Sequence, residues 1–140
     1  FSKTFGLPSI RVGCIIGASE NMNILSSFRP AYEISYPSLK IAEYFLDNIH
    51  LTHKYIEECC EGRSYLVGEL QNNNIEYNGK SNYLINIKIK NKNICDKIYT
   101  KLEIRNIYTR KFEDYISITI GPMEYMKIFF KNFLEIYINF

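Results

Sequence analysis

The chain has 140 residues, a formal net charge of +2 at pH 7 and 46% hydrophobic residues. This length is enough for a domain with its own core, and the scattered, nearly balanced charge argues against a nucleic-acid-binding surface. No apolar run approaches the roughly 20 residues that a membrane-spanning helix needs. The cysteines show no C-x-x-C spacing, so we expect a reduced, cytoplasmic protein with no nucleic-acid or membrane partner.

The first seventeen residues, FSKTFGLPSIRVGCIIG, place a lysine directly after a serine and an arginine eight positions further on. A Gly-Leu-Pro turn separates Lys3 from Arg11, and such a turn can direct both cations into one pocket. Arginine binds phosphate bidentately, and a desolvated lysine near other cations becomes a nucleophilic amine. We therefore expect a site for a small dianionic ligand with an aldehyde. On the alternative interpretation Lys3 is a surface lysine and Arg11 begins an ordinary strand.

Two elements are predicted before the first proline-rich loop. Residues 10–16 are predicted to form a buried strand, because the run is short, apolar and bounded by glycine. A short helix should follow with Ser19 as its N-cap and with Met22 and Leu25 on one face. Arg29-Pro30 should end this helix, because the residue before a proline disfavours helical geometry.

A long helical region is predicted next. Residues 29–38 contain two prolines and two serines and should form a loop, and Pro37 suits the first turn of the following helix. The apolar pattern then continues to about Leu70 with a mild break at Glu61-Gly62, which predicts one long helix or two nearly collinear ones. The asparagines at 72–74 should end it.

From residue 75 the pattern predicts the order strand, strand, helix, strand, strand, helix. Apolar residues alternate along the strands and recur every three or four positions along the helices. This order predicts a small α+β layer with helices on one face of a mainly antiparallel sheet. The expected elements are strands at 75–77, 83–90, 107–110 and 115–120, a helix carrying Ile94, Ile98 and Leu102, and a last helix that starts at Gly121-Pro122 and buries Met126, Phe129, Phe130, Phe133, Tyr137 and Phe140.

The motif Ser-Lys-Thr-Phe-Gly-Leu-Pro-x-x-Arg-x-Gly resembles the pyridoxal-phosphate lysine motif of fold-type I (class I/II) aminotransferases, and most closely that of the histidinol-phosphate aminotransferase-like branch. The resemblance implies that Lys3 binds the cofactor pyridoxal 5'-phosphate as a Schiff base and acts as the general base. It also implies that Ser2 and Arg11 hold the cofactor phosphate. A lysine followed eight residues later by Arg-x-Gly is a fairly specific pattern, whereas a Ser-Lys dipeptide alone carries no information.

The resemblance implies an α/β fold class in three parts. Residues 1–36 would be the C-terminal piece of the large PLP-binding domain, residues 37–73 the linker helix region, and residues 74–140 the small C-terminal α+β domain. The chain opens inside a motif without an initiator methionine, so we expect a piece of a longer protein. By itself it should be poorly active, because in this family the residues that stack on the cofactor ring and pair with its nitrogen precede Phe1.

The segment Arg29-Pro30-Ala31-Tyr32-Glu33-Ile34-Ser35 looks like the loop before the linker helix in these aminotransferases. In related enzymes an arginine here reaches across the dimer interface to the distal anion of the substrate. The resemblance thus implies a homodimer with its active site at the interface, and it makes Arg29 and Tyr32 candidates for substrate binding. Alternatively, Arg29 caps the C-terminus of the preceding helix, where the helix dipole favours a cation.

Residues 115–126 resemble the family's C-terminal strand–turn–helix, usually x-Ile-Arg-Ile-Thr-Leu-Gly-Pro-x-Glu, with one important departure. Ser117 stands where the family has the arginine that clamps the carboxylate or phosphate of the substrate. A serine offers one neutral donor in place of a charged bidentate fork. Three explanations stay open: Arg110 or Lys111 substitutes for the missing arginine, the substrate has no carboxylate at this position, or the protein is a degenerate relative.

The implied function is PLP-dependent transfer of an amino group between an amino acid donor and a keto or aldehyde acceptor, the latter a phosphorylated or phosphonate-like small molecule. One alternative is an amino-acid-phosphate decarboxylase, because without a clamp at Ser117 a carboxylate could stand perpendicular to the cofactor ring. Another is a non-catalytic dimerisation or regulatory module with a vestigial lysine. No metal site is expected, because Cys59 and Cys60 lie two helical turns beyond His50 and His53 and are splayed apart.

Overall fold

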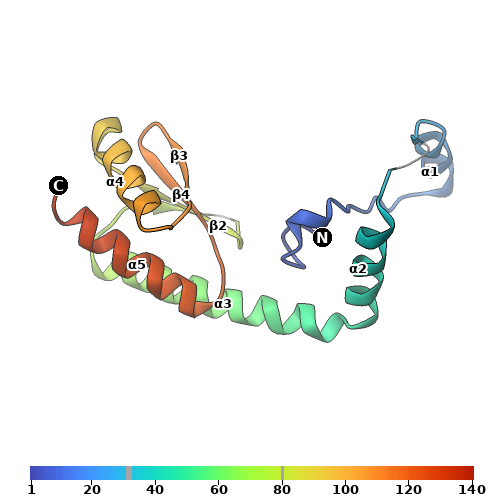
Figure 1. The fold of residues 1–140 in the computed structure, drawn as a ribbon, viewed down its shortest axis with the longest axis horizontal. Coiled ribbons are helices and arrows are strands. Elements are labelled where there is room, and N and C mark those ends of the chain that lie inside the picture. Colours follow the sequence, from blue (N-terminus) through green and yellow to red (C-terminus); the bar gives the residue numbers. More distant parts are fainter. Residues whose placement is uncertain (31–32, 80) are drawn as a thin grey trace. The chain divides into compact units, whose positions relative to one another are not determined.

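The structure is a computed structural model that describes residues 1–30, 33–79 and 81–140. It divides into two compact units, Phe1–Ile56 and Glu57–Phe140. Within the described residues, every helix is too short or too polar to span a membrane. Figure 1 shows the elements, which in chain order are η1 (Pro8–Ile10), α1 (Ser19–Ser26), α2 (Tyr36–Asp47), α3 (Ile49–Asn72), β1 (Tyr77–Asn78), β2 (Leu84–Lys88), α4 (Lys92–Ile104), β3 (Arg110–Phe112), β4 (Tyr115–Thr119) and α5 (Met123–Tyr137).

The predicted strand at residues 10–16 is wrong. The 3-10 helix η1 ends at Ile10, Arg11 adopts a left-handed φ of 55°, and residues 11–18 have no regular secondary structure. A strand needs a neighbour to pair its backbone N–H and C=O groups, and no other strand occurs between residues 1 and 30. Ile15 and Ile16 are instead 70% and 95% exposed.

The predicted short helix is present as α1, but its N-cap prediction is wrong. Ser19 is the first helical residue, and the cap is Ala18, whose extended backbone makes no side-chain capping hydrogen bond. The Ala18 carbonyl accepts from the Met22 amide at 3.0 Å. The helix ends at Ser26, shortly before Arg29-Pro30, and no residue of α1 is buried.

The predicted linker region forms two helices, α2 and α3, which are not collinear. Asn48 lies between them with φ −114° and ψ 49°, outside the helical region, and Figure 1 shows the chain changing direction there. Ser35 caps α2 by accepting from the Ser38 amide at 3.3 Å, and Pro37 occupies its first turn as predicted. Helix α3 runs through Gly62 without the predicted break.

The second unit has the predicted α+β architecture. Its four strands pair antiparallel in the order β1-β2-β4-β3. Along the chain, β1 and β2 are followed by α4, and β3 and β4 by α5, as expected. Alternate residues of the two central strands, Ile85 and Ile87 of β2 and Ile116 and Ile118 of β4, are buried in one core. The helices add Leu66 and Leu70 of α3, Cys95, Ile98 and Leu102 of α4, and Met126, Phe129, Phe130, Phe133 and Ile136 of α5, and the connecting segments add Ile75, Ile89 and Ile120.

Helices α3 and α4 end in the same way, and for this reason two strands begin later than predicted. Each helix is followed by a left-handed asparagine, Asn74 with φ 53° and Asn106 with φ 59°. The next residue is an isoleucine whose amide donates back into the helix, from Ile75 to Leu70 and from Ile107 to Leu102, both at 2.9 Å. These are Schellman ends, in which an apolar residue packs against the helix it terminates.

The predicted strands at 75–77 and 107–110 are therefore displaced toward the C-terminus. Ile75 and Ile107 pack in or against the core as parts of the helix ends, so their amides are not available to a sheet. The strands begin later, at Tyr77 for β1 and at Arg110 for β3. The prediction was right about the existence and order of these strands and wrong about their first residues.

The backbone of α3 approaches the turn between β4 and α5 at Gly62. A Cβ atom on this glycine would lie 2.1 Å from the Gly121 carbonyl oxygen and 3.1 Å from the Met123 amide nitrogen. Both neighbours are backbone atoms, which cannot move aside as a flexible side chain can. Gly62 therefore allows α3 to pack directly beneath the turn that follows Ser117 and its strand.

We predict that Gly62→Ala lowers the free energy of unfolding by at least about 2 kcal/mol, because the added methyl group overlaps the backbone of residue 121. Gly68→Ala is the matched control in the same helix, since a Cβ atom there would meet nothing within 4 Å. This control should stabilise the protein by about 0.5–1 kcal/mol through helix propensity. Urea denaturation of the full-length protein measures the free energy of unfolding of both variants. A Gly62→Ala protein as stable as wild type would contradict the close backbone contact at Gly62.

Candidate functional site

Lys3 lies in a hydrogen-bonded turn that covers residues 2–5. The Gly6 amide donates to the Lys3 carbonyl at 3.1 Å, and the Phe5 amide donates to the Phe1 carbonyl at 3.2 Å. The rings of Phe1 and Phe5 stack with their centroids 4.4 Å apart and their planes 25° apart. The turn thus has its own local hydrogen bonds and an aromatic contact on either side of the lysine.

Both the backbone conformation at residue 6 and the space around it favour a glycine. Its φ is +66°, in the region that favours glycine, and a Cβ atom there would lie 3.0 Å from Tyr55 Cε1. The glycine therefore lets the Lys3 turn lie against the Tyr55 ring of α3. This explains the glycine of the Gly-Leu-Pro motif in physical terms.

Arg11 follows η1 with its guanidinium on the surface. Its Nη1 atom donates to the Pro8 carbonyl at 3.0 Å. Ser2 is half-buried and Lys3 is exposed in the same segment. Ser2, Lys3 and Arg11 thus place a hydroxyl, an amine and a guanidinium within one short segment. In chemical type these groups fit the aldehyde and phosphate of the expected pyridoxal 5'-phosphate.

Arg29 pairs with a neighbouring carboxylate. Its Nε and Nη2 atoms lie 2.9 and 2.8 Å from Oε2 of Glu33, and the hydrogen bond to Glu33 raises the pKa of the arginine. The pair borders a hollow of about 600 Å³ that is also lined by Ile15, Leu25 and Phe28. The side chain thus binds Glu33 in this structure. Tyr32, the other candidate in this loop, lies outside the described residues.

Ser117 lies on the face of the sheet opposite the core. The strand register places it directly across from Asn86 of β2 on one side and Arg110 of β3 on the other. Asn86 in turn lies across from Asn78 of β1. Because paired residues point to the same face of a sheet, these four side chains form one row, which we call the polar row.

The polar row separates the two cations that the sequence offered as substitutes for the missing arginine. Arg110 shares the face of Ser117 and is exposed, and its guanidinium makes no hydrogen bond or ion pair with any other residue that the structure describes. Lys111 is paired with the buried Ile116 and therefore points to the opposite face, where its ammonium forms an ion pair with Asp96 of α4. The register thus brings Arg110, and not Lys111, next to Ser117.

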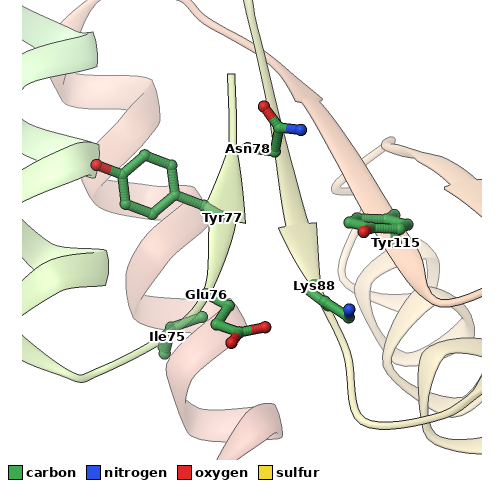
Figure 2. A pocket seen from close by; sticks show the side chains of 6 residues that line it. All are labelled: Ile75, Glu76, Tyr77, Asn78, Lys88 and Tyr115. Atoms are coloured by element: carbon green, nitrogen blue, oxygen red, sulfur yellow. The ribbon is translucent and has the colours of Figure 1, made fainter. Parts of the chain in front are cut away.

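A hollow of about 570 Å³ lies beside the polar row. Figure 2 shows its lining, with Asn78 from the polar row, Lys88 and Tyr115 from the next row along the strands, and Glu76 just before β1. The Lys88 ammonium lies 5.9 Å from the centroid of the Tyr115 ring. The face that carries Ser117 is therefore a hollowed surface with both polar and aromatic groups.

The candidate residues fall into two groups. Ser2, Lys3, Arg11 and Arg29 belong to the unit 1–56, whereas Arg110 and Ser117 belong to the unit 57–140. Sequence reasoning missed Asn86 as a neighbour of Ser117. The alternation in YLINIKIK already placed Asn86 off the core face, but only the pairing register shows which residue of β4 it meets.

No group of three or more His, Cys, Asp or Glu side chains in the described part of the chain could hold a metal ion. Cys95, the one buried thiol among the four cysteines, lies in the core, and its burial raises its pKa. A buried neutral thiol is unreactive, so Cys95 contributes packing.

Comparison with known proteins identifies the family. Residues 1–130 match the model of the family described as aminotransferase class I and II. Among curated proteins, the chain is 26% identical over 137 residues to a histidinol-phosphate aminotransferase of Thermotoga neapolitana, covering 98% of this chain and 40% of that protein. It is 29% identical over 147 residues to the histidinol-phosphate aminotransferase of Ruminiclostridium cellulolyticum, covering 99% of this chain and 40% of that protein.

Solved structures show the same fold. A crystal structure described as that of an aminotransferase from Burkholderia pseudomallei superposes with a TM-score of 0.84 at 19% identity, covering 96% of this chain and 42% of that one. One described as a histidinol-phosphate aminotransferase from Erwinia carotovora atroseptica gives 0.83 at 14% identity, covering 96% and 40%. The chain thus spans about 40% of the length of these relatives. Because the family model matches nearly the whole sequence, the chain belongs to the aminotransferase class I and II family.

Proposed function

We propose that the full-length protein transfers an amino group from an amino acid donor to a keto or aldehyde acceptor, with pyridoxal 5'-phosphate as cofactor. The observation that carries this proposal is the Lys3 turn, followed by Arg11, in a chain that belongs to the aminotransferase class I and II family. The proposal concerns the longer protein, because the chain spans about 40% of its relatives.

Three residues of the first unit would hold the cofactor. Lys3 would bind it covalently through its amine and, once released, would move a proton at the amino-bearing carbon of the substrate. Ser2 and Arg11 would bind the phosphate, the arginine by a charge-assisted hydrogen bond. Bound pyridoxal phosphate supplies an electron sink for the bonds to that carbon, and the protein orients the reacting groups.

The proposed substrate is a small molecule with a phosphate or phosphonate group. Its support is the polar row, where Arg110 offers an exposed guanidinium beside the buried Ser117. Arginine matches the geometry of a phosphate better than lysine does. We propose that Arg110 binds the substrate anion in place of the arginine that the family has at residue 117, and that Ser117 donates a neutral hydrogen bond.

Two copies of the protein are proposed to form the active site together. The first unit exposes large apolar side chains, including Ile16 at 95% and Phe28 at 81%, which the rest of the longer protein or a second copy would cover. In such a dimer Arg29 would release Glu33 and bind the distal anion of a substrate held by the partner.

We predict that Lys3→Ala abolishes the visible absorbance band of the cofactor-loaded protein and lowers turnover at least about 100-fold, because the covalent amine and the proton-transferring group are both lost. Lys54→Ala is the matched control, since Lys54 is also an exposed lysine of the same unit. Absorbance spectra of the full-length protein with pyridoxal phosphate measure the band, and product formation from an amino donor and a keto acceptor measures turnover.

Other outcomes of this experiment would support other functions. A wild-type band that responds to amino substrates while carbon dioxide is released would indicate decarboxylation. No band at all in wild type would indicate a non-catalytic module with a vestigial lysine. Unchanged turnover in Lys3→Ala would contradict the proposal directly.

We predict that Arg110→Gln raises the KM for histidinol phosphate about 10- to 100-fold and leaves the KM for histidinol unchanged, because a hydrogen bond to a charged group is worth about 1.5–3 kcal/mol. Arg110→Lys should restore only part of the affinity, since it keeps the charge but not the fork. Lys90→Gln removes the same charge from an exposed residue just after β2 and should change neither value. An equal rise in the KM for histidinol phosphate and in the KM for histidinol would contradict a phosphate-binding function for Arg110.

A further inference from the structure

Three uncharged polar side chains share the polar row with Arg110, namely Asn78, Asn86 and Ser117. They lie on the face of the sheet opposite the core, which we call the open face. None of these three side chains makes a hydrogen bond with another residue in the part of the chain that the structure describes. Asn86 is half-buried and Ser117 is buried. Polar groups at such positions normally have hydrogen-bond partners, so their donors are available to a ligand.

Asn86 is the least expected residue of the row, because it occupies a central strand. Strand β2 pairs with β1 on one side and with β4 on the other, and the residues before and after Asn86, Ile85 and Ile87, are fully buried. Asparagine is depleted in strands, since its side chain packs poorly there and competes with the backbone for hydrogen bonds. A residue that departs from the local preference without a visible gain in stability often belongs to a functional site.

Asn86 lies directly across from Ser117, on the side away from Arg110. Residues paired in this way have Cβ atoms about 5 Å apart and point to the same face of the sheet. Ser117 has the shortest side chain of the three and lies between the two longer ones. An anion that contacts the Ser117 hydroxyl is therefore within reach of the Arg110 guanidinium from one side and of the Asn86 amide from the other.

The chemistry of these side chains matches a phosphate. The polar row contains hydrogen-bond donors and no carboxylate. Arg110 presents a fork of N–H groups, Ser117 an O–H group and Asn86 an NH2 group. A phosphate or phosphonate has three terminal oxygens that accept hydrogen bonds, whereas a carboxylate has two. A phosphate can therefore give each of the three residues an oxygen of its own.

We propose that Asn86 is a further substrate-binding residue: its amide N–H donates to the phosphate or phosphonate that Arg110 and Ser117 bind. The inference rests on the proposed function of Arg110 and deepens it by a third donor. Asn78 continues the row on β1. It lies two strands from Ser117, about 10 Å away, which is too far for the same anion to reach. It is therefore a matched control.

The test uses the full-length protein saturated with pyridoxal phosphate, so that the site of the cofactor phosphate is filled, and inorganic phosphate as the probe. Asn86→Leu removes the amide and keeps a side chain of similar size. We expect the dissociation constant of phosphate, measured by titration calorimetry, to rise about 10-fold, because a hydrogen bond to a charged group is lost. Asn86→Asp should raise it at least about 100-fold, since a carboxylate at this position repels the anion.

Urea denaturation of the same variants separates binding from structure. An amide without a partner contributes little to stability, and leucine suits a central strand at least as well as asparagine does. Asn86→Leu should therefore unfold at the same urea concentration as wild type or at a higher one. Asn78→Leu removes the same amide from the far end of the row and should leave the dissociation constant of phosphate within about twofold of wild type.

The possible outcomes separate this inference from the proposed function. Weaker phosphate binding in Asn86→Leu together with a lower urea midpoint would overturn the inference, because Asn86 would then be a structural residue. An equal loss of binding in Asn78→Leu would also overturn it. Unchanged binding in Asn86→Leu with weaker binding in Arg110→Gln would overturn the inference and leave the proposed function intact. Unchanged binding in both variants would overturn the anion-binding function of Arg110 as well.

Discussion

The two-residue period of β4 is the constraint on which the second unit depends. Ile116 and Ile118 point into the core, so the residue between them must point to the open face. A shift by one residue would bury Ser117 among the helices and expose two isoleucines, which the hydrophobic core forbids. The core therefore fixes the direction of Ser117. Pairing with the neighbouring strands then determines that Asn86 and Arg110 lie beside it.

The resemblance to the family's C-terminal motif leads us to expect an arginine where this chain has Ser117. Along the chain, Ser117 would therefore be a neutral group in place of a charged one. On the sheet, a guanidinium remains one strand away on the same face, at Arg110. A sheet brings together residues that are distant in sequence. A residue on a neighbouring strand can therefore bind the same ligand when the residue at the original position is substituted.

The sequence predicted much of the second unit, because its strands and helices bury one regular face each. Two strands there begin later than predicted for one reason: Ile75 and Ile107 look like strand residues but serve as the apolar ends of helices α3 and α4. In the first unit the strand at 10–16 failed because apolar composition does not supply a pairing partner. For the site, sequence motifs pointed to Lys3 and Arg11, whereas the neighbours of Ser117 follow from register, which no motif encodes.

The proposed function depends above all on covalent binding of pyridoxal phosphate by Lys3. The most direct measurement is to load the full-length protein with the cofactor, reduce it with borohydride, digest it and locate the modified lysine by mass spectrometry. Reduction converts the lysine–cofactor bond into a stable amine, so we expect a pyridoxyl group on the peptide that contains Lys3 and on no other. A label on a different lysine, or none after the cofactor is shown to be bound, would contradict it.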